Sequence, residues 1–556
     1  MTKRQTIIFT SLSVLVFLLA LLLSGRFWFR LDFTKSRAYT ISQTSRNLHR
    51  EIPDPVKITY YLSNRLRSVI TAPGEIEDML KEYAGYSKGK IFFSVRDPVR
   101  DGITTMVEEL GLQPRQVQTV EMDQASLVTV YSGIVIEYLD YTEVIPWVIS
   151  TDTLEYDITS RIRAMVTNRE RQIGVIIGDF FRQWREDFSY LDMTLSSAGY
   201  RVRLISPDEE IPDNLPALFV LGGAEGLDEF ALYRIDRYIQ LGGKVLFAVK
   251  GVFVDTVYGS IEVRHHEDYG LFEMISSYGV DILPELALDR SALSLQYQTR
   301  TQTGAMQLRI VRYPLWIGVL GENVNTQHPV SANFSGLDMF WASPLELKPP
   351  PSVDASVLFT STPEGWSMRD TFYTSPEVIY FMEMEAPETK GTKILGASLS
   401  GVFPSFFKGW KPAREGTDAE LPDMPGTASP SRIIVIGDTD FATNLITATQ
   451  AVHNLDFLLR AADWLANDDD IIGIRNRQPQ ASRFDKILDL EKRAAAMRFS
   501  QILNVGLIPL LVIMAGLTLA SLRKKRAGWE LKFLLKTASK PEETDKIMEG
   551  GSDIQE

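Results

Sequence analysis

The sequence predicts an α/β protein whose large body lies between two transmembrane helices. An uncharged apolar segment lies near each end of the chain, at residues 7–23 and 502–522. Between these segments, strand-like apolar runs alternate with helix-like ones, as they do in α/β domains. The 556 residues, 45% of them hydrophobic and 23% charged, suffice for more than one globular domain.

The two apolar segments are long enough to cross a membrane as helices. A hydrocarbon core is ~30 Å thick and a helix rises ~1.5 Å per residue, so residues 502–522 span it and residues 7–23 span it with little tilt. A cleaved signal peptide is the alternative for the first segment, but no A-x-A-like site follows it, which favours an uncleaved anchor within residues 1–25. The basic run 523–526 places the tail, residues 523–556, in the cytoplasm. Two spans then put both termini on the cytoplasmic side and the body outside.

Residues 26–168 are predicted to form a thioredoxin-like α/β domain. The pattern predicts a strand, a helix, a strand, a helix and then further strands, the last of which form a hairpin around Leu139 to Tyr141. The segments concerned are residues 57–63, 74–87, 90–97, 103–111, 117–122 and 127–148. The chain contains no cysteine, so this domain has no thiol redox chemistry and is expected to act as a scaffold or binding surface.

Residues 169–475 are predicted to form a doubly wound α/β domain. The run RQIGVIIGDF, residues 171–180, is apolar almost throughout, which is typical of a strand buried on both faces of a parallel sheet. From about 290 to 430 the pattern breaks into short β-like runs, which we interpret as a β-rich insertion or a small β-rich subdomain. The run RIIVIGDTDF, residues 432–441, resumes the α/β pattern and is predicted to rejoin the same sheet. Residues 476–501 are predicted as an amphipathic linker helix that leads to the second span.

Composition and motifs exclude several functions. The net charge of -13 argues against a nucleic-acid partner, because phosphate binding needs clustered Lys and Arg. The sequence contains no GxxxxGK[ST] loop, GxSxG elbow or HExxH motif, so it provides no ATPase, serine nucleophile or zinc-protease site of its own. No cofactor is predicted. The run from His265 to Asp268, His-His-Glu-Asp, is interpreted as a solvated loop rather than a metal site.

Acidic residues follow two of the predicted strands. Asp179 ends the first run of the doubly wound domain, and Asp438 and Asp440 end the last one. The carboxyl ends of such strands share one rim, where these folds bind ligands, so the three aspartates are candidate ligands of a divalent cation. The favoured alternative is that they shape strand-to-helix turns by accepting backbone N–H groups. A hydrolase with paired carboxylates would need a separation of ~5–10 Å, which a spacing of two residues does not establish.

The segment RLDFTKSRAYTISQTSRNLHREIPDPVKITYYLS, residues 30–63, resembles the signature of the GldG-type auxiliary membrane subunits of ABC transporters, a gliding-motility-associated family. The usual form of that signature is R-x-D-L-T, then Y-T-L-S, then D-P-V and a strand that ends in Y-x-S. The positions that keep it are Asp32, Thr34, Tyr39, Thr40, Ser42, Pro55, Val56, Tyr61 and Ser63. Further matches follow in order, among them LEYDITSRIRAM, IDRYIQLGGKVLF and IIVIGDTDFATN.

This resemblance implies a subunit of the bacterial inner (cytoplasmic) membrane that contacts membrane lipid and works with a separate permease and a separate P-loop ATPase. It also implies a flavodoxin or glutamine-amidotransferase-like fold for residues 169–475. Such amidotransferases use a cysteine and a histidine, so their chemistry cannot be carried over to a chain without cysteine.

The predicted function is therefore a non-enzymatic auxiliary or substrate-binding component of a multi-subunit ABC transport system. One alternative is a membrane-anchored, metal-assisted hydrolase that uses the three aspartates. Another is a cell-envelope scaffold that binds protein or glycan, for which exposed aromatic residues such as Trp366 and Trp410 could stack on sugars, although buried packing is the commoner role of a tryptophan.

Overall fold

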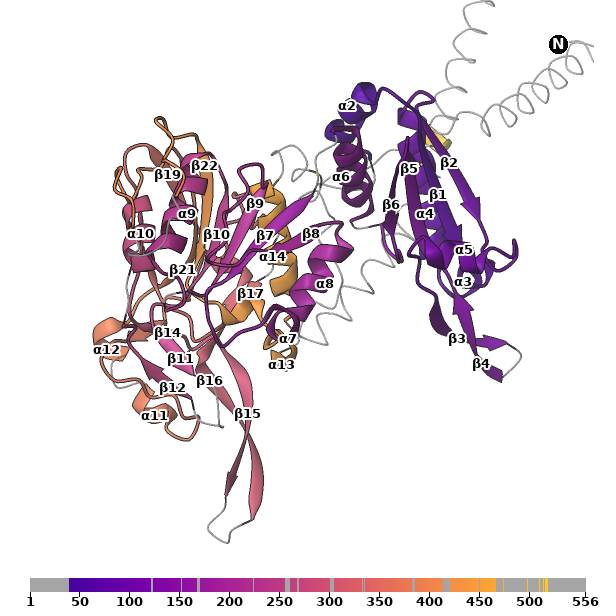
Figure 1. Cartoon of the computed structure of the whole chain (residues 1–556). Coiled ribbons are helices and arrows are strands. Elements are labelled where there is room, and N and C mark those ends of the chain that lie inside the picture. The colour runs from indigo at the N-terminus through magenta and orange to yellow at the C-terminus, as the bar shows by residue number, and fades with distance from the viewer. Residues whose placement is uncertain are drawn as a thin grey trace, which may run out of the picture. The chain divides into compact units, whose positions relative to one another are not determined.

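The structure is a computed structural model, and it describes most of the chain between residues 40 and 466 (Figure 1). The gaps in this range are 122–123, 152, 168–170, 224, 256–260, 268–269, 301–304, 333, 335, 383–385, 414–420 and 450, and a few isolated positions between 474 and 518 are also described. Within these described parts, no helix combines the length and the apolar character that crossing a bilayer requires. The first predicted span, the tail and nearly all of the linker helix and second span lie outside them.

The N-terminal domain contains a four-stranded sheet in the order β2-β1-β5-β6. The strands are β1 (Val56–Leu62), β2 (Ile91–Arg96), β5 (Ser132–Tyr138) and β6 (Tyr141–Ile145). The helices are α2 (Gln43–Glu51), α3 (Asn64–Val69), α4 (Ala72–Tyr86), α5 (Thr104–Glu109) and α6 (Leu154–Thr167). Strands β1 and β2 are parallel, and β5 runs antiparallel to both β1 and β6. The predicted order of elements is confirmed, and so is the hairpin, which turns at Leu139 with a φ of 50°.

Local sequence explains two features of this domain. Strand β1 is buried at all but one of its positions, since it is a central strand with apolar residues facing both sides. Helix α2 begins at Ser42, whose side chain accepts the N–H of Ser45 at 3.1 Å as an N-cap. An additional hairpin, β3 (Arg115–Glu121) and β4 (Gln124–Val130), precedes β5 and pairs only with itself among the described residues.

The second domain is built on five parallel strands in the order β8-β7-β9-β10-β22. These strands are β7 (Gln172–Ile177), β8 (Arg201–Leu204), β9 (Ala217–Leu221), β10 (Val245–Ala248) and β22 (Ser431–Ile436). Counted along the chain the spatial order is 2-1-3-4-5, which is the flavodoxin type of doubly wound sheet. The prediction that the run at 432–441 rejoins this sheet is confirmed, because β22 pairs in parallel with β10.

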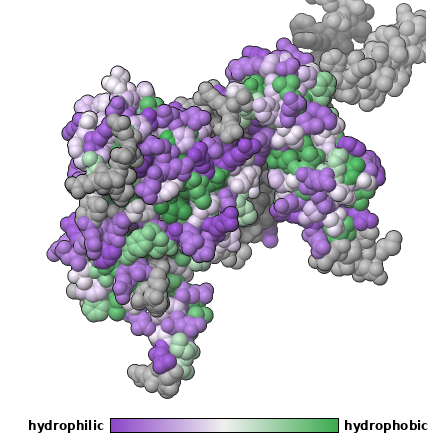
Figure 2. Space-filling model, viewed as in Figure 1, coloured by the Kyte–Doolittle hydropathy of each residue, from purple (hydrophilic) through white to green (hydrophobic). Residues whose placement is uncertain are grey.

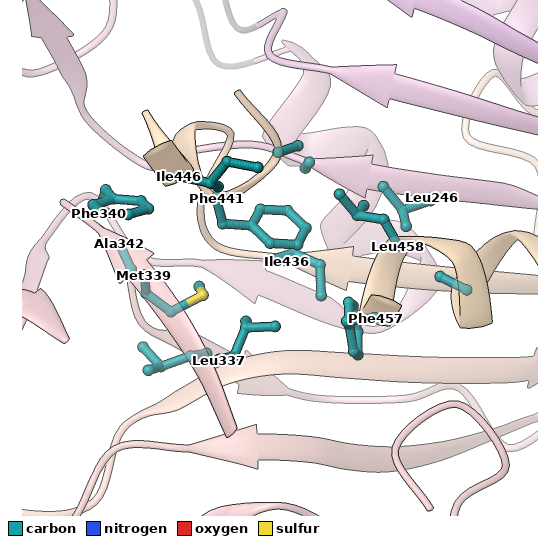
Figure 3. Close-up of a cluster of buried hydrophobic side chains, with 14 of the residues drawn as sticks. Leu246, Leu337, Met339, Phe340, Ala342, Ile436, Phe441, Ile446, Phe457 and Leu458 are labelled. Atoms are coloured by element: carbon teal, nitrogen blue, oxygen red, sulfur yellow. The ribbon is translucent and has the colours of Figure 1, made fainter. Parts of the chain in front are cut away.

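Helices cover both faces of the parallel strands. These helices are α7 (Trp184–Asp187), α8 (Ser189–Ser197), α9 (Glu229–Gln240), α10 (Gly270–Tyr278), α13 (Ile446–Thr449) and α14 (Val452–Ala466). Successive strand residues point to opposite faces, so Leu246 of β10 packs with α8 and α14 while Phe247 packs with α9 and α10. Figure 3 shows the first of these cores, in which Leu246 and Ile436 lie near Phe457 and Leu458 of α14.

The β-rich insertion contributes to the main sheet. Its strands β21 (Ile394–Gly401), β18 (Leu345–Leu347) and β19 (Val353–Thr360) extend the sheet beyond β22 in antiparallel pairing, together with β13 (Val280–Ile282). The remaining short elements of the second domain, inside and outside the insertion, are β11 (Phe253–Asp255), β12 (Glu262–Arg264), β14 (Leu286–Leu288), β17 (Gly336–Phe340), β20 (Trp366–Met368), α11 (Ile379–Met382), α12 (Ala386–Thr389), η2 (Gly321–Asn323) and η3 (Asp440–Ala442). The insertion is therefore partly fused to the doubly wound sheet.

A long two-stranded arm leaves this region (Figure 1). It consists of β15 (Ala292–Arg300) and the outer part of β16 (Met306–Leu320), which pair antiparallel. Met306, Leu308 and Ile310 alternate along β16 and are each about 60% exposed. In the space-filling view the arm shows apolar residues mixed with hydrophilic ones (Figure 2).

Candidate functional site

The strongest candidate site is a cleft at the carboxyl ends of the parallel strands. It has a volume of about 340 Å³ that includes space open to solvent. Residues that follow β7, β9, β10 and β22 all line it, so it lies at the rim where strand order reverses between β7 and β9. The side chains that matter most below are Asp179, Phe181, Arg182, Lys250, Phe253 and His266.

Two glycine turns let the β7 and β9 rims approach each other. Gly222 has a φ of 73°, and a Cβ on it would lie 2.2 Å from Cγ of Asp179. A Cβ on Gly178 would lie 2.2 Å from Cα of Gly223. Only glycine fits both positions, because one also needs a left-handed backbone and both have no space for a side chain. These turns hold the Asp179 carboxylate at the cleft wall.

Asp440 is the centre of a buried ion cluster. Arg182 Nη2 and Lys250 Nζ both donate to its carboxylate oxygens. The side chains of Asp440 and Lys250 are only 5% and 8% exposed. Burial alone would raise the pKa of Asp440, but the two cations outweigh it and hold the pKa below its usual value. Asp440 is thus ionised and fully paired.

Asp438 shapes the turn after β22 from inside the protein. Its Oδ1 accepts the N–H of Asp440 at 2.7 Å and its Oδ2 accepts the N–H of Phe340 at 2.7 Å. Its side chain is completely buried, and Lys250 Nζ lies 3.6 Å from Oδ1. Burial raises the pKa of Asp438 to about 7, an effect that Lys250 opposes. The interpretation of this aspartate as a turn-shaping residue is confirmed.

Asp179 is the carboxylate of the cluster that faces the cleft. Its Oδ1 accepts the N–H of Gly223 at 2.9 Å, and its Oδ2 lies 3.5 Å from Nε of Arg182. Its side chain is 20% exposed, the largest value in the cluster. Burial raises its pKa, and Arg182 opposes this. The structure therefore brings the three predicted aspartates to one rim but gives each a different environment.

Sequence reasoning missed the residues that balance these charges. Lys250 comes two residues after the end of β10 and Arg182 comes three residues after Asp179, so both could have been found by extending the rim argument to every strand end. The run from His265 to Asp268 gave no sign that His266 lies at this rim. Its Nε2 lies 3.0 Å from the carbonyl oxygen of Lys250 and its side chain is 7% exposed. The expectation of a solvated loop fits His265, which is exposed, but is wrong for His266.

Two further predictions concern metal ions and sugars. Among the described residues, no three His, Asp or Glu side chains are placed to hold a metal ion together. The cationic side chains of Arg182 and Lys250 already lie between the three aspartates. A metal ion at this rim stays a prediction. Trp366 is 1% exposed and donates its indole N–H to the carbonyl of Met382, so it is a core residue and cannot stack on a glycan. Trp410 is 53% exposed and stacks on Phe407.

Comparison with known proteins relates the chain to transport systems. The model of a family described as "ABC-type uncharacterized transport system" matches residues 170–461, and a domain of unknown function, DUF7088, matches residues 35–137. An uncharacterized protein of Borreliella burgdorferi is 26% identical over 511 residues, which are 90% of this chain and 94% of that protein.

Two solved structures are similar at a much lower level. The mmIFT52 N-terminal domain has a TM-score of 0.31 and 9% identity, over 53% of this chain and 98% of that one. A ThuA-like protein from Parabacteroides merdae has a TM-score of 0.25 and 12% identity, over 54% of this chain and 90% of that one.

Proposed function

Because the chain belongs to the family of ABC-type uncharacterized transport system auxiliary proteins, we propose that it is the ligand-recognition subunit of such a system. In this proposal it is non-enzymatic and works with a separate permease and a separate P-loop ATPase. A GldG-type role linked to gliding motility is part of the same proposal. The two predicted spans anchor the chain in lipid at the bacterial inner membrane, with both termini in the cytoplasm and the body outside.

The observation that carries the proposal is the cleft at the carboxyl rim of the parallel strands. Doubly wound sheets bind ligands at this place, and here the cleft combines fixed charges with aromatic walls. The chain has no P-loop, so the energy for transport has to come from a partner. The flavodoxin or amidotransferase-like domain would carry the ligand, and the thioredoxin-like domain would act as a scaffold.

Coupling requires that the partner responds to the occupied cleft. A ligand shifts a conformational equilibrium only if it binds one state more tightly than the other. The segments that adjoin the cleft, β11, β12 and the turn from Phe180 to Gln183, would be the elements that differ between states. ATP hydrolysis in the permease–ATPase pair would then depend on this chain.

The test is purification of the tagged full-length chain from gently solubilised membranes. We expect a permease and a P-loop ATPase to co-purify in fixed ratio, and ATP hydrolysis by this assembly to differ from that of the permease–ATPase pair alone. A chain that is isolated as a stable monomer from the same membranes, without either partner, would contradict the proposal.

A further inference from the structure

The charges around the cleft do not balance. Asp179, Asp438 and Asp440 supply three carboxylates, whereas Arg182 and Lys250 supply two cations. Nearby, Arg264 donates to both oxygens of Glu225 at 2.6 and 2.8 Å, so that pair adds no net charge. His266 is neutral near pH 7, because burial lowers its pKa. The carboxylates of this set therefore outnumber the cations by one, and burial of Asp438, which raises its pKa to about 7, relieves part of this imbalance.

Asp179 is the carboxylate of this set that remains open to a ligand. Asp440 accepts from both cations, and Asp438 is enclosed, with each of its oxygens accepting a backbone N–H. In Asp179, by contrast, only Oδ1 accepts a hydrogen bond in the described parts of the chain. The ion-pair contact of its Oδ2 with Arg182 is 3.5 Å long, which exceeds ordinary hydrogen-bond length. This oxygen can accept a donor from a ligand.

The same geometry disfavours anions and metal ions as occupants. The N–H groups that a phosphate or carboxylate would use are engaged, since Arg182 and Lys250 donate to Asp440 and Gly223 donates to Asp179. A divalent cation prefers six or more oxygen ligands, several of them carboxylates. One accessible carboxylate oxygen does not supply that set.

The aromatic walls already attract cations. The rings of Phe181 and Phe253 meet edge to face with centroids 5.7 Å apart. Cζ of Arg182 lies 5.4 Å from the centroid of Phe181, and Cζ of Arg264 lies 4.1 Å from that of Phe253. Phe181 is 44% exposed, so part of its surface remains accessible to a ligand. Ring faces next to a carboxylate favour positive charge over a neutral group of the same shape.

We propose that the cleft binds a small organic cation, with its ammonium group paired to Asp179 and packed against Phe181 and Phe253. This inference rests on the proposed ligand-recognition role and names the chemical class of the ligand. Asp179 supplies the counter-charge, and the two phenylalanine rings supply apolar contact that a hydrated metal ion would not use.

The test compares cationic probes with neutral probes of similar size and shape. Choline is paired with 3,3-dimethylbutan-1-ol and butylammonium with butan-1-ol, and each is titrated calorimetrically into the full chain in detergent. We expect each cation to bind at least tenfold more tightly than its neutral counterpart. Phosphate, acetate and Mg²⁺ are titrated in parallel and are expected to show no binding at the same concentrations.

Two variants test whether Asp179 and Phe181 cause the preference for cations. Asp179→Asn keeps an oxygen for the N–H of Gly223 but removes the charge, so the preference for the cation over the neutral probe should disappear. Phe181→Leu keeps apolar volume without an aromatic face and should reduce the preference severalfold, which gives a readout if Asp179→Asn fails to fold. The matched control is Glu364→Gln, which removes a carboxylate from an ion pair with Lys390 whose side chains are both about half exposed, and it should leave the preference unchanged.

Equal affinity for charged and neutral probes, tighter binding of the anions or Mg²⁺, or no binding of any probe at millimolar concentration would overturn the organic-cation class. None of these results affects the proposed function if the permease and ATPase still co-purify. Loss of that assembly would overturn the proposed function whatever the cleft binds.

Discussion

Replacing Lys250 with methionine should destabilise the α/β domain by about 3 to 5 kcal/mol, because it removes one partner of a buried ion cluster. The ammonium group lies between Asp438 and Asp440 and 5.2 Å from the ring centroid of Trp341. Methionine keeps a side chain of similar length, so the core is not emptied. The two carboxylates remain buried and lose their shared counter-charge.

The magnitude follows from the distances. At the 3.6 Å between Lys250 Nζ and Asp438 Oδ1, Coulomb attraction is about 5 kcal/mol at an effective dielectric constant of ~20. Protonation of Asp438 provides partial relief, since burial already raises its pKa to about 7. A carboxyl whose folded pKa is raised favours the folded state in its neutral form, and this contribution is lost as the pH rises through 7. The destabilisation by Lys250→Met should therefore be larger at pH 8 than at pH 6.

The assay is hydrogen exchange of the amides of β10 and β22 under increasing denaturant, which reports the free energy of unfolding of the domain that contains them. Lys390→Met is the matched control, because Lys390 and its partner Glu364 are each about half exposed and solvent screens such surface pairs. If Lys250→Met cost no more than this control at pH 8, the cluster would be solvated and Lys250 would not hold the two carboxylates in the folded domain.

Three other substitutions test the turn geometry and the N-terminal domain. Gly222→Ala should lower the stability by more than about 1 kcal/mol and weaken ligand binding, because its φ of 73° is strained for alanine and its Cβ would meet the carboxylate of Asp179. Gly85→Ala is the control: Gly85 lies in α4, and a Cβ there would have no other atom within 4 Å. This control should instead stabilise the protein by about 0.5 to 1 kcal/mol in thermal unfolding. Burial lowers the pKa of His49 to about 4 from 6.5, so the unfolded state binds the extra proton between these pH values and stability falls as the pH drops through this window. His49→Phe should remove about 2 to 3 kcal/mol of this pH dependence. The measurement is hydrogen exchange of the α2 and α4 amides, corrected for intrinsic exchange rates. If stability fell at acidic pH as much in the variant as in the wild type, His49 would be solvated.

Much of the fold could be predicted because hydrophobic patterning is local. The continuous apolar runs of β7 and β22 and the helical spacing of α4 and α9 are visible in any window of the sequence. The partners of β18, β19 and β21 could not be predicted, since short β-like runs carry no information on which strand they join. These strands extend the main sheet through pairings that link residues far apart in sequence, such as Gly396 with Ile436.

In the candidate site, too, the sequence could predict some features and not others. The rule that ligands bind at the carboxyl ends of parallel strands located Asp179, Asp438 and Asp440 correctly at one rim. Their ionisation was not predictable, because it depends on burial and on contacts with Arg182 and Lys250 that form only when the turns after β7, β10 and β22 come together. Sequence spacing places side chains on an edge, whereas the pKa of each carboxyl depends on burial and on charges brought close only by the fold.

These differences in environment bear directly on the hydrolase alternative. Hydrolysis with two carboxyl groups needs one acid and one base that both reach the substrate. Asp438 has a pKa suited to proton transfer near neutral pH, but its side chain is fully buried and both of its oxygens accept backbone N–H groups. Asp440 is held ionised by two cations, which leaves it unsuited to donate a proton. Of the three aspartates, only Asp179 borders the cleft among the described residues, so a hydrolase built on these three would have one carboxyl where it needs two. A single, partly exposed carboxylate next to a paired ion cluster is better suited to holding a ligand than to cleaving one.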